Sequence, residues 1–475
     1  MSSVAVAMQH QGFRVGGSDQ QIYPPASELL GSADVRLYTP YSEHNLRDFA
    51  PDLVVVGNSV SRGNPEVEYV LSHRLPFVSL PELVKREIVE GTFSIVVTGT
   101  HGKTTTTALI AWILERAGYA PGFLIGGIPG NFSSGFRYPQ RTALADTPVV
   151  VLEGDEYDAA FFDKRSKFLH YLPSVLVMNN LEYDHADIFP DMAALKQQFR
   201  WLLRLVPADG LLVANGDDAN VMEVLRTGPV YTSNIHRFSF NGQGEVHITI
   251  LKTTAQGSLF QIHDRQSRTV QEFWLPIPGR HMVSNAVAAI TAVKPLAISH
   301  QVLQHALETF RLPRRRLERK VTAGEITVYE DFAHHPTALR ATLQALRQQH
   351  PEQRLVAVVE PRSNTMVRRV FQQPMAEALQ AADVVFFAPP YRYQRYAPED
   401  RLDIEQLARQ YRQQGKQAEA VPLQWWDRQW SDWLLERLQS VVAAGDVVVF
   451  FSNGAFDGLV QKFVEQLEHL KQIDE

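Results

Sequence analysis

The sequence contains no cysteine among its 475 residues. That absence excludes disulfides, thiolate metal sites and thiol nucleophiles, and it fits a reducing compartment. The longest apolar runs, such as 447–451, have the length of a strand and fall far short of a membrane span. The first residues also lack the basic segment and apolar core of a signal peptide. We therefore expect a cytoplasmic protein without a membrane partner.

A strong charge of one sign is also missing. The formal net charge of −6 gives no electrostatic footprint for nucleic acid. The basic run Arg314–Arg316 is either a solvated linker or a source of one functional arginine. We find no internal repeat, and the residues single out no oligomeric state. The 45% hydrophobic and 21% charged residues are typical of a globular protein.

The chain is too long for one core, and its length predicts roughly three domains. Short strands that close on Gly, Ser and Asp predict a first α/β domain over residues 1–90, with Ser18, Asp19 and Ser59 at its ligand edge. Residues 91–311 read as a mostly parallel sheet with a small antiparallel appendage at 244–274. Residues 312–475 alternate strands and helices again, which predicts another covered parallel sheet.

Residues 94–107 have the pattern of a buried strand, a glycine turn and a helix start. Gly99 and Gly102 permit a tight turn that aims backbone N–H groups at an anion, and the helix adds its positive end. Lys103 can then reach the outer phosphates of a nucleotide, and Thr104 can place its hydroxyl on a bridging Mg²⁺. We interpret this segment as a site for the phosphates of ATP. The alternative is a plain glycine turn before a helix.

Two more polar clusters follow apolar strands. Glu153-Gly-Asp-Glu-Tyr-Asp158 holds either a divalent metal or a solvated acidic turn, and Glu153, nearest the strand end, is the first choice as ligand. In 179–189, His185 can bind a second metal through one ring nitrogen, although a lone histidine is more often structural. Because three such sites follow strands of one domain, we expect a shared metal and phosphate centre. Without a Ser or Cys nucleophile motif, this centre suggests phosphoryl transfer.

Taken in order, several motifs resemble the Mur ligase family of ATP-dependent, amide-forming enzymes of peptidoglycan assembly. They are G-T-H-G-K-T, E-G-D-E-Y-D, N-L-E-Y-D-H, H-x-x-x-N, R-R-L-E and D-F-A-H-H-P. The match covers nearly the whole chain. It implies an amino-terminal Rossmann-like domain for a UDP-sugar, a central P-loop ATPase-like domain and a carboxyl-terminal Rossmann-like domain for the incoming peptide.

Segments 126–132, 158–168 and 360–366 look like the family member that recycles murein. That member joins the tripeptide L-Ala-γ-D-Glu-meso-diaminopimelate to UDP-N-acetylmuramate. The resemblance implies that ATP phosphorylates the lactoyl carboxylate and that the peptide amine attacks the acyl phosphate. The physics agrees, since a free carboxylate is a poor acyl donor.

The resemblance also implies roles for individual residues. The catalytic set is Lys103, His185, Arg316 and Asp331. The nucleotide contacts are Gly99, Thr100, His101, Gly102, Lys103, Thr104, Thr105, Asn285, Arg316 and Asp331. The Mg²⁺ ligands are Thr104 and Glu153 for one ion and His185 for a second. Candidates for the nucleotide, peptide or sugar are His334, Arg362, Asn364, Asp163, Lys164 and Arg165. For Arg362 a structural salt bridge is the alternative, and for residues 163–165 a surface turn.

The phosphate-binding turn departs from the commoner G-x-x-x-x-G-K-[ST], because Val97 stands where that pattern has its first glycine. From the family itself the sequence departs at two places. Met282 replaces the asparagine of a His-Asn pair. The family also begins with a strand and a Gly-rich loop that bind the UDP pyrophosphate, and the alignment of 12–19 places Met1 after them. We therefore expect a first domain that lacks its first strand and that loop, with the true start upstream of Met1.

Two alternatives come from this reasoning. One is the neighbouring family member that adds L-alanine to the same UDP-sugar. The other is a catalytically impaired nucleotide-binding homologue, which the missing loop would permit. Folate polyglutamylation shares the ATPase core but fits His334 and His335 less well.

Overall fold

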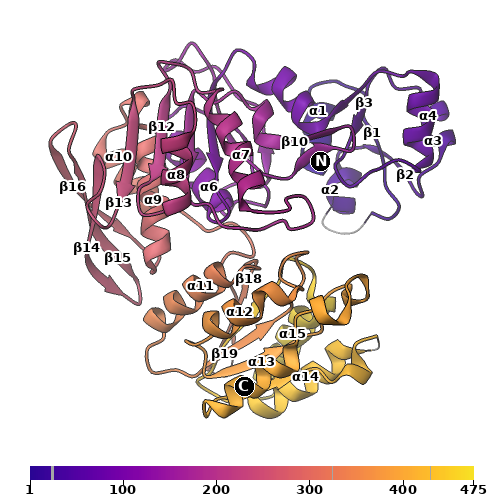
Figure 1. The fold of residues 1–475 in the computed structure, drawn as a ribbon, viewed down its shortest axis with the longest axis vertical. Coiled ribbons are helices and arrows are strands. Elements are labelled where there is room, and N and C mark those ends of the chain that lie inside the picture. The colour runs from indigo at the N-terminus through magenta and orange to yellow at the C-terminus, as the bar shows by residue number, and fades with distance from the viewer. Residues whose placement is uncertain (23–25, 324, 428, 475) are drawn as a thin grey trace.

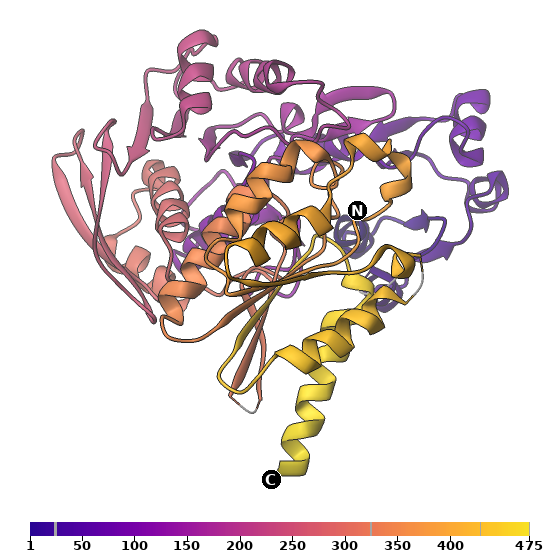
Figure 2. The same ribbon diagram turned by 60° about the horizontal axis from the view of Figure 1, so that its bottom comes forward.

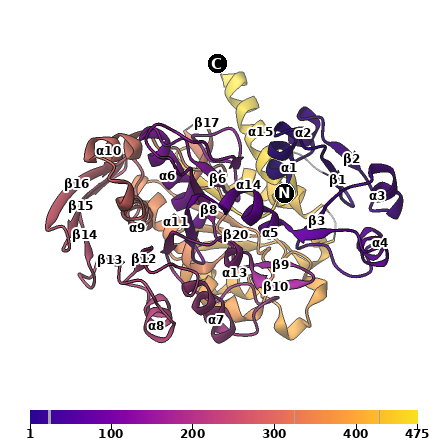
Figure 3. The same ribbon diagram turned by 90° about the horizontal axis from the view of Figure 1, so that it is seen from above.

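The computed structural model describes residues 1–22, 26–323, 325–427 and 429–474 (Figure 1). A large central sheet has the first ninety residues at one end and a separate carboxyl-terminal sheet beneath it in this view. The first ninety residues and the β14–β16 end of the central sheet lie at opposite sides of the molecule (Figure 3).

The central sheet has ten strands in the order β16-β15-β14-β13-β12-β11-β5-β8-β6-β7. The strands between residues 93 and 275 are β5 (Phe93–Thr98), β6 (Gly122–Leu124), β7 (Phe136–Arg137), β8 (Val149–Glu153), β9 (Asp158–Ala160), β10 (Asp163–Ser166), β11 (Val175–Met178), β12 (Leu211–Asn215), β13 (Ile235–Ser239), β14 (Val246–Thr254), β15 (Gly257–Asp264) and β16 (Thr269–Leu275). β9 and β10 form a separate antiparallel pair.

The buried side chains of the central strands alternate between two hydrophobic cores, as the two-residue period of a strand requires. Ile95 and Val97 face one core with α6, α9 and α10, whereas Val96 faces the other with α1, α5, α7 and α8. The helices after residue 100 are α6 (Lys103–Arg116), α7 (Met192–Leu203), α8 (Ala219–Thr227), α9 (Arg280–Ala292) and α10 (His300–Thr309). Helices therefore cover both faces of the parallel strands, and strand-end residues are left for chemistry.

The carboxyl-terminal sheet has six strands in the order β17-β18-β22-β19-β20-β21, and only the β17–β18 pair is antiparallel. Its strands are β17 (Glu318–Ala323), β18 (Ile326–Asp331), β19 (Leu355–Val359), β20 (Val384–Phe387), β21 (Gln417–Ala420) and β22 (Val447–Phe451). Its helices are α11 (Pro336–Gln349), α12 (Gln372–Ala378), α13 (Ile404–Gln413), α14 (Trp430–Val441) and α15 (Leu459–Asp474). The last of these helices projects beyond the sheet (Figure 2).

The first ninety residues form two separate parallel pairs, β1–β2 and β3–β4. The strands are β1 (Gly16–Ser18), β2 (Arg36–Tyr38), β3 (Val54–Val56) and β4 (Phe77–Ser79), and the α-helices are α1 (Ser2–His10), α2 (Ala26–Ser32), α3 (Glu43–Phe49), α4 (Pro65–His73) and α5 (Leu80–Val84). In the part of the chain that the structure describes, no strand joins the two pairs.

The predicted α/β architecture is confirmed, including the parallel sheets. The antiparallel segment predicted for the central domain is also present: β14 pairs with β13, and β15 and β16 continue the end of the ten-stranded sheet as antiparallel strands. The first strand, β1, begins at Gly16, and Phe13 before it is 49% exposed. Among the described residues, no helix is long and apolar enough to cross a membrane.

Candidate active site

The turn between β5 and α6 has the geometry that its glycines predict. Gly99 and Gly102 have φ values of 128° and 77°, a region that costs glycine little. A Cβ on Gly102 would lie 2.5 Å from the side-chain oxygen of Asn285, and one on Gly99 would lie 2.9 Å from the carbonyl of Asn180. The turn therefore brings backbone against its neighbours where other residues would collide.

The backbone amides of this turn are only partly free for an anion. Thr100 N–H and His101 N–H donate to the carbonyl and the side-chain oxygen of Asn180, at 3.1 and 2.7 Å. The first-turn amides of α6 have no intrahelical acceptor, and no side chain caps the helix. The N–H groups available to an anion are therefore those of the first turn of α6, rather than those of the whole glycine turn.

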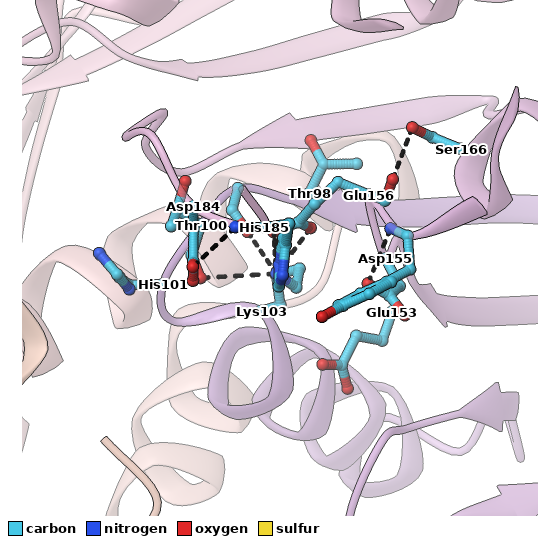
Figure 4. A network of polar contacts seen from close by, with 12 residues as sticks. Thr98, Thr100, His101, Lys103, Glu153, Asp155, Glu156, Ser166, Asp184 and His185 are labelled. Atoms are coloured by element: carbon cyan, nitrogen blue, oxygen red, sulfur yellow. Dashed lines mark hydrogen bonds and ion pairs between the residues drawn. The ribbon is translucent and has the colours of Figure 1, made fainter. Parts of the chain in front are cut away.

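Lys103 folds back over the turn into a buried ion pair (Figure 4). Its Nζ donates to the Gly99 carbonyl at 2.7 Å and to the Glu156 carboxylate at 2.8 and 3.0 Å. Although burial lowers the pKa of Lys103, Glu156 and Asp155 raise it above its ordinary value. Burial likewise raises the pKa of Glu156, but Lys103 and His185 hold it below the ordinary value. Both groups therefore stay charged.

His185 lies on the other side of the same carboxylate. Its Nε2 is 3.1 Å from Glu156 Oε1, and its ring packs 4.2 Å from that of Tyr157. Burial lowers the pKa of His185, but Glu156 and Asp184 leave it raised overall. Sequence reasoning singled out the acidic segment that holds Glu156 but chose Glu153 from it. Glu156 lies three residues after Glu153, and nothing in the sequence pattern indicated that this second glutamate would lie over the turn.

Glu153 and Thr104 form a second contact between the strand end of β8 and the start of α6. The Thr104 hydroxyl donates to Glu153 Oε1 at 2.8 Å, and Gly126 N–H donates to Oε2 at 2.7 Å. From the carboxyl-terminal part, Arg316 Nη2 reaches the Thr104 hydroxyl at 3.3 Å. The structure therefore brings Lys103, Thr104, Glu153, His185 and Arg316 together, as predicted.

Asp331 ends β18 and is 5% exposed. It accepts from the N–H groups of Leu317 and Ala333 at 2.6 and 2.7 Å, so it shapes the loops that carry Arg316 and His334. Burial raises the pKa of Asp331 despite the nearby Arg316.

A cavity of about 1680 Å³ connects these groups. The predicted residues that line it are Thr100, His101, Gly102, Lys103, Thr104, Thr105, Glu153, His185, Asn285, Arg316, Asp331, His334, Arg362 and Asn364. The predicted residues outside its lining are Gly99, Ser18, Asp19, Ser59, Asp163, Lys164 and Arg165. Lys164 and Arg165 instead pair with Asp158 and Asp163, at 2.6 and 2.7 Å. Lys167, which sequence reasoning did not single out, does line the cavity.

The loop after β19 in the carboxyl-terminal part touches the segment that contains His185. The Asn364 side chain donates to Asp187 at 2.8 Å, and Thr365 Oγ1 accepts from Ala186 N–H at 3.1 Å. Arg362 pairs with Glu360 at 3.0 Å and stacks 3.8 Å over the Tyr391 ring. The salt bridge that sequence reasoning kept as the alternative for Arg362 is therefore present, while its guanidinium still lines the cavity.

Comparisons with known proteins show the family to which the chain belongs. Models of the Mur ligase family catalytic domain, the Mur ligase middle domain and the Mur ligase glutamate ligase domain match residues 1–88, 97–293 and 315–454. A Haemophilus influenzae protein named UDP-N-acetylmuramate--L-alanyl-gamma-D-glutamyl-meso-2,6-diaminoheptandioate ligase is 37% identical over 469 residues, 98% of this chain and 97% of its own. The chain belongs to the Mur ligase family. It is thus a ligase of a family that forms C–N bonds with ATP.

Other similar proteins are also named as ligases. The Escherichia coli protein of the same name is also 37% identical, over 98% of this chain and 96% of its own. A crystal structure of a murein peptide ligase from Psychrobacter arcticus superposes with a TM-score of 0.72 at 32% identity, over 98% of this chain and 96% of that one. A UDP-N-acetylmuramate--L-alanine ligase from Salinibacter ruber is 30% identical over 99% of this chain and 93% of its own.

Removal of Glu156 should destabilise the protein strongly, because Lys103 would remain buried without its main counter-ion. For Glu156→Ala we expect the free energy of unfolding to fall by about 3–5 kcal/mol. The matched control is Glu68→Ala, which removes a carboxylate from an exposed pair with Arg62 and should change little. Urea unfolding measures both. Equal losses in the two variants would contradict a special role for the buried pair.

Acid should weaken the fold through His281, which lies at the start of α9. Burial lowers the pKa of this imidazole from 6.5 to about 4. Between these pH values the unfolded chain binds a proton that the folded chain does not, so stability falls as the pH drops from 6.5 toward 4. In His281→Gln, the free energy of unfolding should depend less steeply on pH across that window. Identical slopes in the variant and the original protein would show that this histidine is not held neutral.

Proposed function

We propose that this chain joins the tripeptide L-Ala-γ-D-Glu-meso-diaminopimelate to UDP-N-acetylmuramate at the expense of ATP. The observation that carries this proposal is the 37% identity, across almost the entire chain, to two relatives named for that reaction. The relative named as an L-alanine ligase is less similar, at 30%. The segments 126–132, 158–168 and 360–366 support the same choice.

The phosphates of ATP bind at the turn before α6 in this proposal. Lys103 leaves Glu156 and takes the β- and γ-phosphates, and the first-turn amides of α6 receive the anion. Asn285, which touches Gly102, contacts the adenine region. Gly99, Thr100, His101 and Thr105 complete the surroundings of the nucleotide. These contacts fix the γ-phosphate for transfer to the lactoyl carboxylate, which makes the carboxylate an acyl donor.

The oxygen-rich side chains around the turn fit Mg²⁺. The Thr104 hydroxyl and a Glu153 carboxylate oxygen lie 2.8 Å apart, close to the spacing of adjacent ligands on one small cation. His185 would hold a second ion, and Glu156 Oε1, 3.1 Å from its Nε2, is placed to share it. Such ions would offset the charge of the phosphates during transfer.

Groups from the carboxyl-terminal part complete the site. Arg316, already within reach of Thr104, would stabilise charge on the transferring phosphoryl group. Asp331 holds the loop of Arg316 in place. His334, Arg362 and Asn364 line the same cavity and would meet the peptide, whose several carboxylates suit an arginine.

We further propose the division of labour among the segments. Residues 1–90 would bind the UDP-sugar with Ser18, Asp19 and Ser59, residues 91–311 the ATP, and residues 312–475 the peptide. The muramoyl end would approach Asp163, Lys164 and Arg165. Because ATP and UDP-linked sugars are cytoplasmic metabolites, we place the reaction in the cytoplasm.

The test is ADP release from the full chain with UDP-N-acetylmuramate, MgATP and either the tripeptide or L-alanine. We expect ADP release with the tripeptide and little with L-alanine. Lys103→Ala should abolish the reaction, whereas Lys462→Ala, which removes a surface lysine paired with Asp432, should not.

Three outcomes would contradict the proposal. Faster ADP release with L-alanine would favour the neighbouring family activity. No ADP release with either acceptor, from a folded chain that binds ATP, would favour an impaired homologue. An undiminished rate in Lys103→Ala would remove the phosphate turn from the mechanism.

A further inference from the structure

Three side chains from distant parts of the sequence converge beside the phosphate-binding turn. His101 Nε2 lies 2.7 Å from Glu182 Oε2, and His335 Nδ1 lies 3.3 Å from the same oxygen. The two imidazole rings are 4.6 Å apart. One possible ligand atom from each of the three residues lies within 4.8 Å of the other two. We refer to His101, Glu182 and His335 as the junction triad.

The chemistry of the junction triad differs from that of the proposed Mg²⁺ ligands. Two imidazoles and one carboxylate are a donor set of zinc enzymes, whereas Mg²⁺ prefers oxygen atoms. Burial lowers the pKa of His335 to about 4, so its ring is neutral and has a free electron pair near neutral pH. Burial raises the pKa of Glu182, but His101 and His335 bring it to about 2, so the carboxylate is charged.

We infer that the junction triad is a site for Zn²⁺ or a transition-metal ion of similar preference, separate from the Mg²⁺ ligands. Three protein ligands would leave one position for water or another donor. The ion would take the place of the hydrogen bond between His101 Nε2 and Glu182 Oε2. It would also compete with Thr337 N–H, which donates to His335 Nδ1 at 3.3 Å. That is a single long hydrogen bond, whereas the ion gains three ligands.

The three residues of the junction triad come from two different parts of the molecule. His101 belongs to the turn before α6, Glu182 to the loop after β11, and His335 caps α11 of the carboxyl-terminal part. A bound ion would therefore tie the carboxyl-terminal part to the phosphate-binding turn. In many enzymes, opening of the parts around a bound nucleotide limits its release, so we expect the ion to slow nucleotide exchange.

Equilibrium dialysis of the full chain against Zn²⁺ tests the site, with excess Mg²⁺ present to occupy the oxygen-rich ligands. We expect one equivalent of zinc in the original protein and loss of that equivalent in His335→Ala, His101→Ala and Glu182→Gln. The control His73→Ala removes an exposed histidine at the end of α4 and should retain it. Co²⁺ in place of Zn²⁺ should give the visible absorption of a four-coordinate ion, lost in the same variants.

Circular dichroism separates loss of the site from loss of the fold, and Glu182→Gln keeps the shape of the side chain. Zinc should also slow release of a fluorescent ADP analogue from the original protein but not from His335→Ala. The inference is overturned if the original protein takes up no zinc under these conditions, or if folded His335→Ala keeps the full equivalent.

A second inference rests on the proposed function and concerns Lys167. Its side chain is 20% exposed and lines the cavity, and its Nζ lies 2.6 Å from Asp155 Oδ2. Burial raises the pKa of Asp155, but the charges of Lys167 and Lys103 bring it below its ordinary value. Lys167 is thus the cation next to the phosphate turn on the side where residues of the amino-terminal segment, Met1–Val4, line the same cavity.

We propose that Lys167 binds the lactoyl carboxylate of the UDP-sugar and positions it toward the γ-phosphate. The two cations expected from sequence for this approach, Lys164 and Arg165, lie outside the cavity and pair with neighbouring carboxylates. Lys167 shares their strand region but turns inward to Asp155. A substrate carboxylate would exchange with Asp155 on its Nζ.

Lys167→Met should raise the KM for UDP-N-acetylmuramate by about tenfold to a hundredfold, the loss expected for one hydrogen bond to a charged group. The Kd for ATP should not change, and Lys167→Arg should restore much of the lost affinity. Lys252→Met is the matched control, because that lysine is exposed on β14, has no proposed role in the site and should leave the KM unchanged. If the original protein is active and Lys167→Met keeps its KM, the assignment of Lys167 is wrong. If the original protein itself releases no ADP, the proposed function fails instead.

Discussion

The buried contact of Lys103 with Glu156 is the interaction on which the site depends. Either charge alone would be costly to keep in the interior, and each is retained because the other is within 3 Å. Glu156 also holds His185, so one carboxylate orients the lysine of the turn and the histidine of the loop after β11. A phosphate group that arrives at the turn must therefore replace one anion at Lys103 by another. Nucleotide binding becomes an exchange of counter-ions, and it leaves Glu156 available to a metal ion.

The same loop links this exchange to the carboxyl-terminal part. Glu182 accepts from Thr337, Ala186 donates to Thr365, and Asp187 accepts from Asn364, at 2.8–3.1 Å. The contacts on the carboxyl-terminal side lie at the start of α11, which follows β18, and in the loop after β19. They therefore hold the ends of these two strands close to the end of β11 in the central sheet. Because His185 lies in the middle of this loop, a change at Glu156 acts on a segment that the carboxyl-terminal part also holds.

Much of this arrangement was predictable from sequence because parallel strands place their carboxyl ends at one edge. The strands before Gly99, Glu153 and Asn179 are largely apolar runs, as expected of strands buried on both faces inside a parallel sheet. Lys103, Thr104, Glu153 and His185 were therefore expected to meet, and they do. The choice of Glu153 over Glu156 within one acidic segment depends on the path of the chain after the strand, which no period or spacing in the sequence records.

Composition and spacing do not determine side-chain pairing at longer range. Lys164 and Arg165 lie on β10 and pair with nearby carboxylates, whereas Lys167 follows the strand and pairs with Asp155 at the cavity. Similarly, Arg316 differs from its neighbours Arg314 and Arg315 only in where the junction places it. Arg315 turns to Glu330 and the carbonyl of Ser452, whereas Arg316 reaches Thr104. Adjacent basic residues look alike in the sequence, and only their tertiary contacts distinguish them.

Charge balance sets the last constraint on the site. The carboxylates of Glu153, Asp155 and Glu156 already face Lys103 and Lys167, so the fixed cations around the turn are matched by fixed anions. A triphosphate adds several negative charges to this balanced site, and the substrate carboxylate adds one more. Repulsion among them would be strong where burial lowers the effective dielectric constant. Divalent cations on the carboxylates would turn that repulsion into attraction. The acidic segment is therefore better understood as a recruiter of cations for the nucleotide than as a barrier to it.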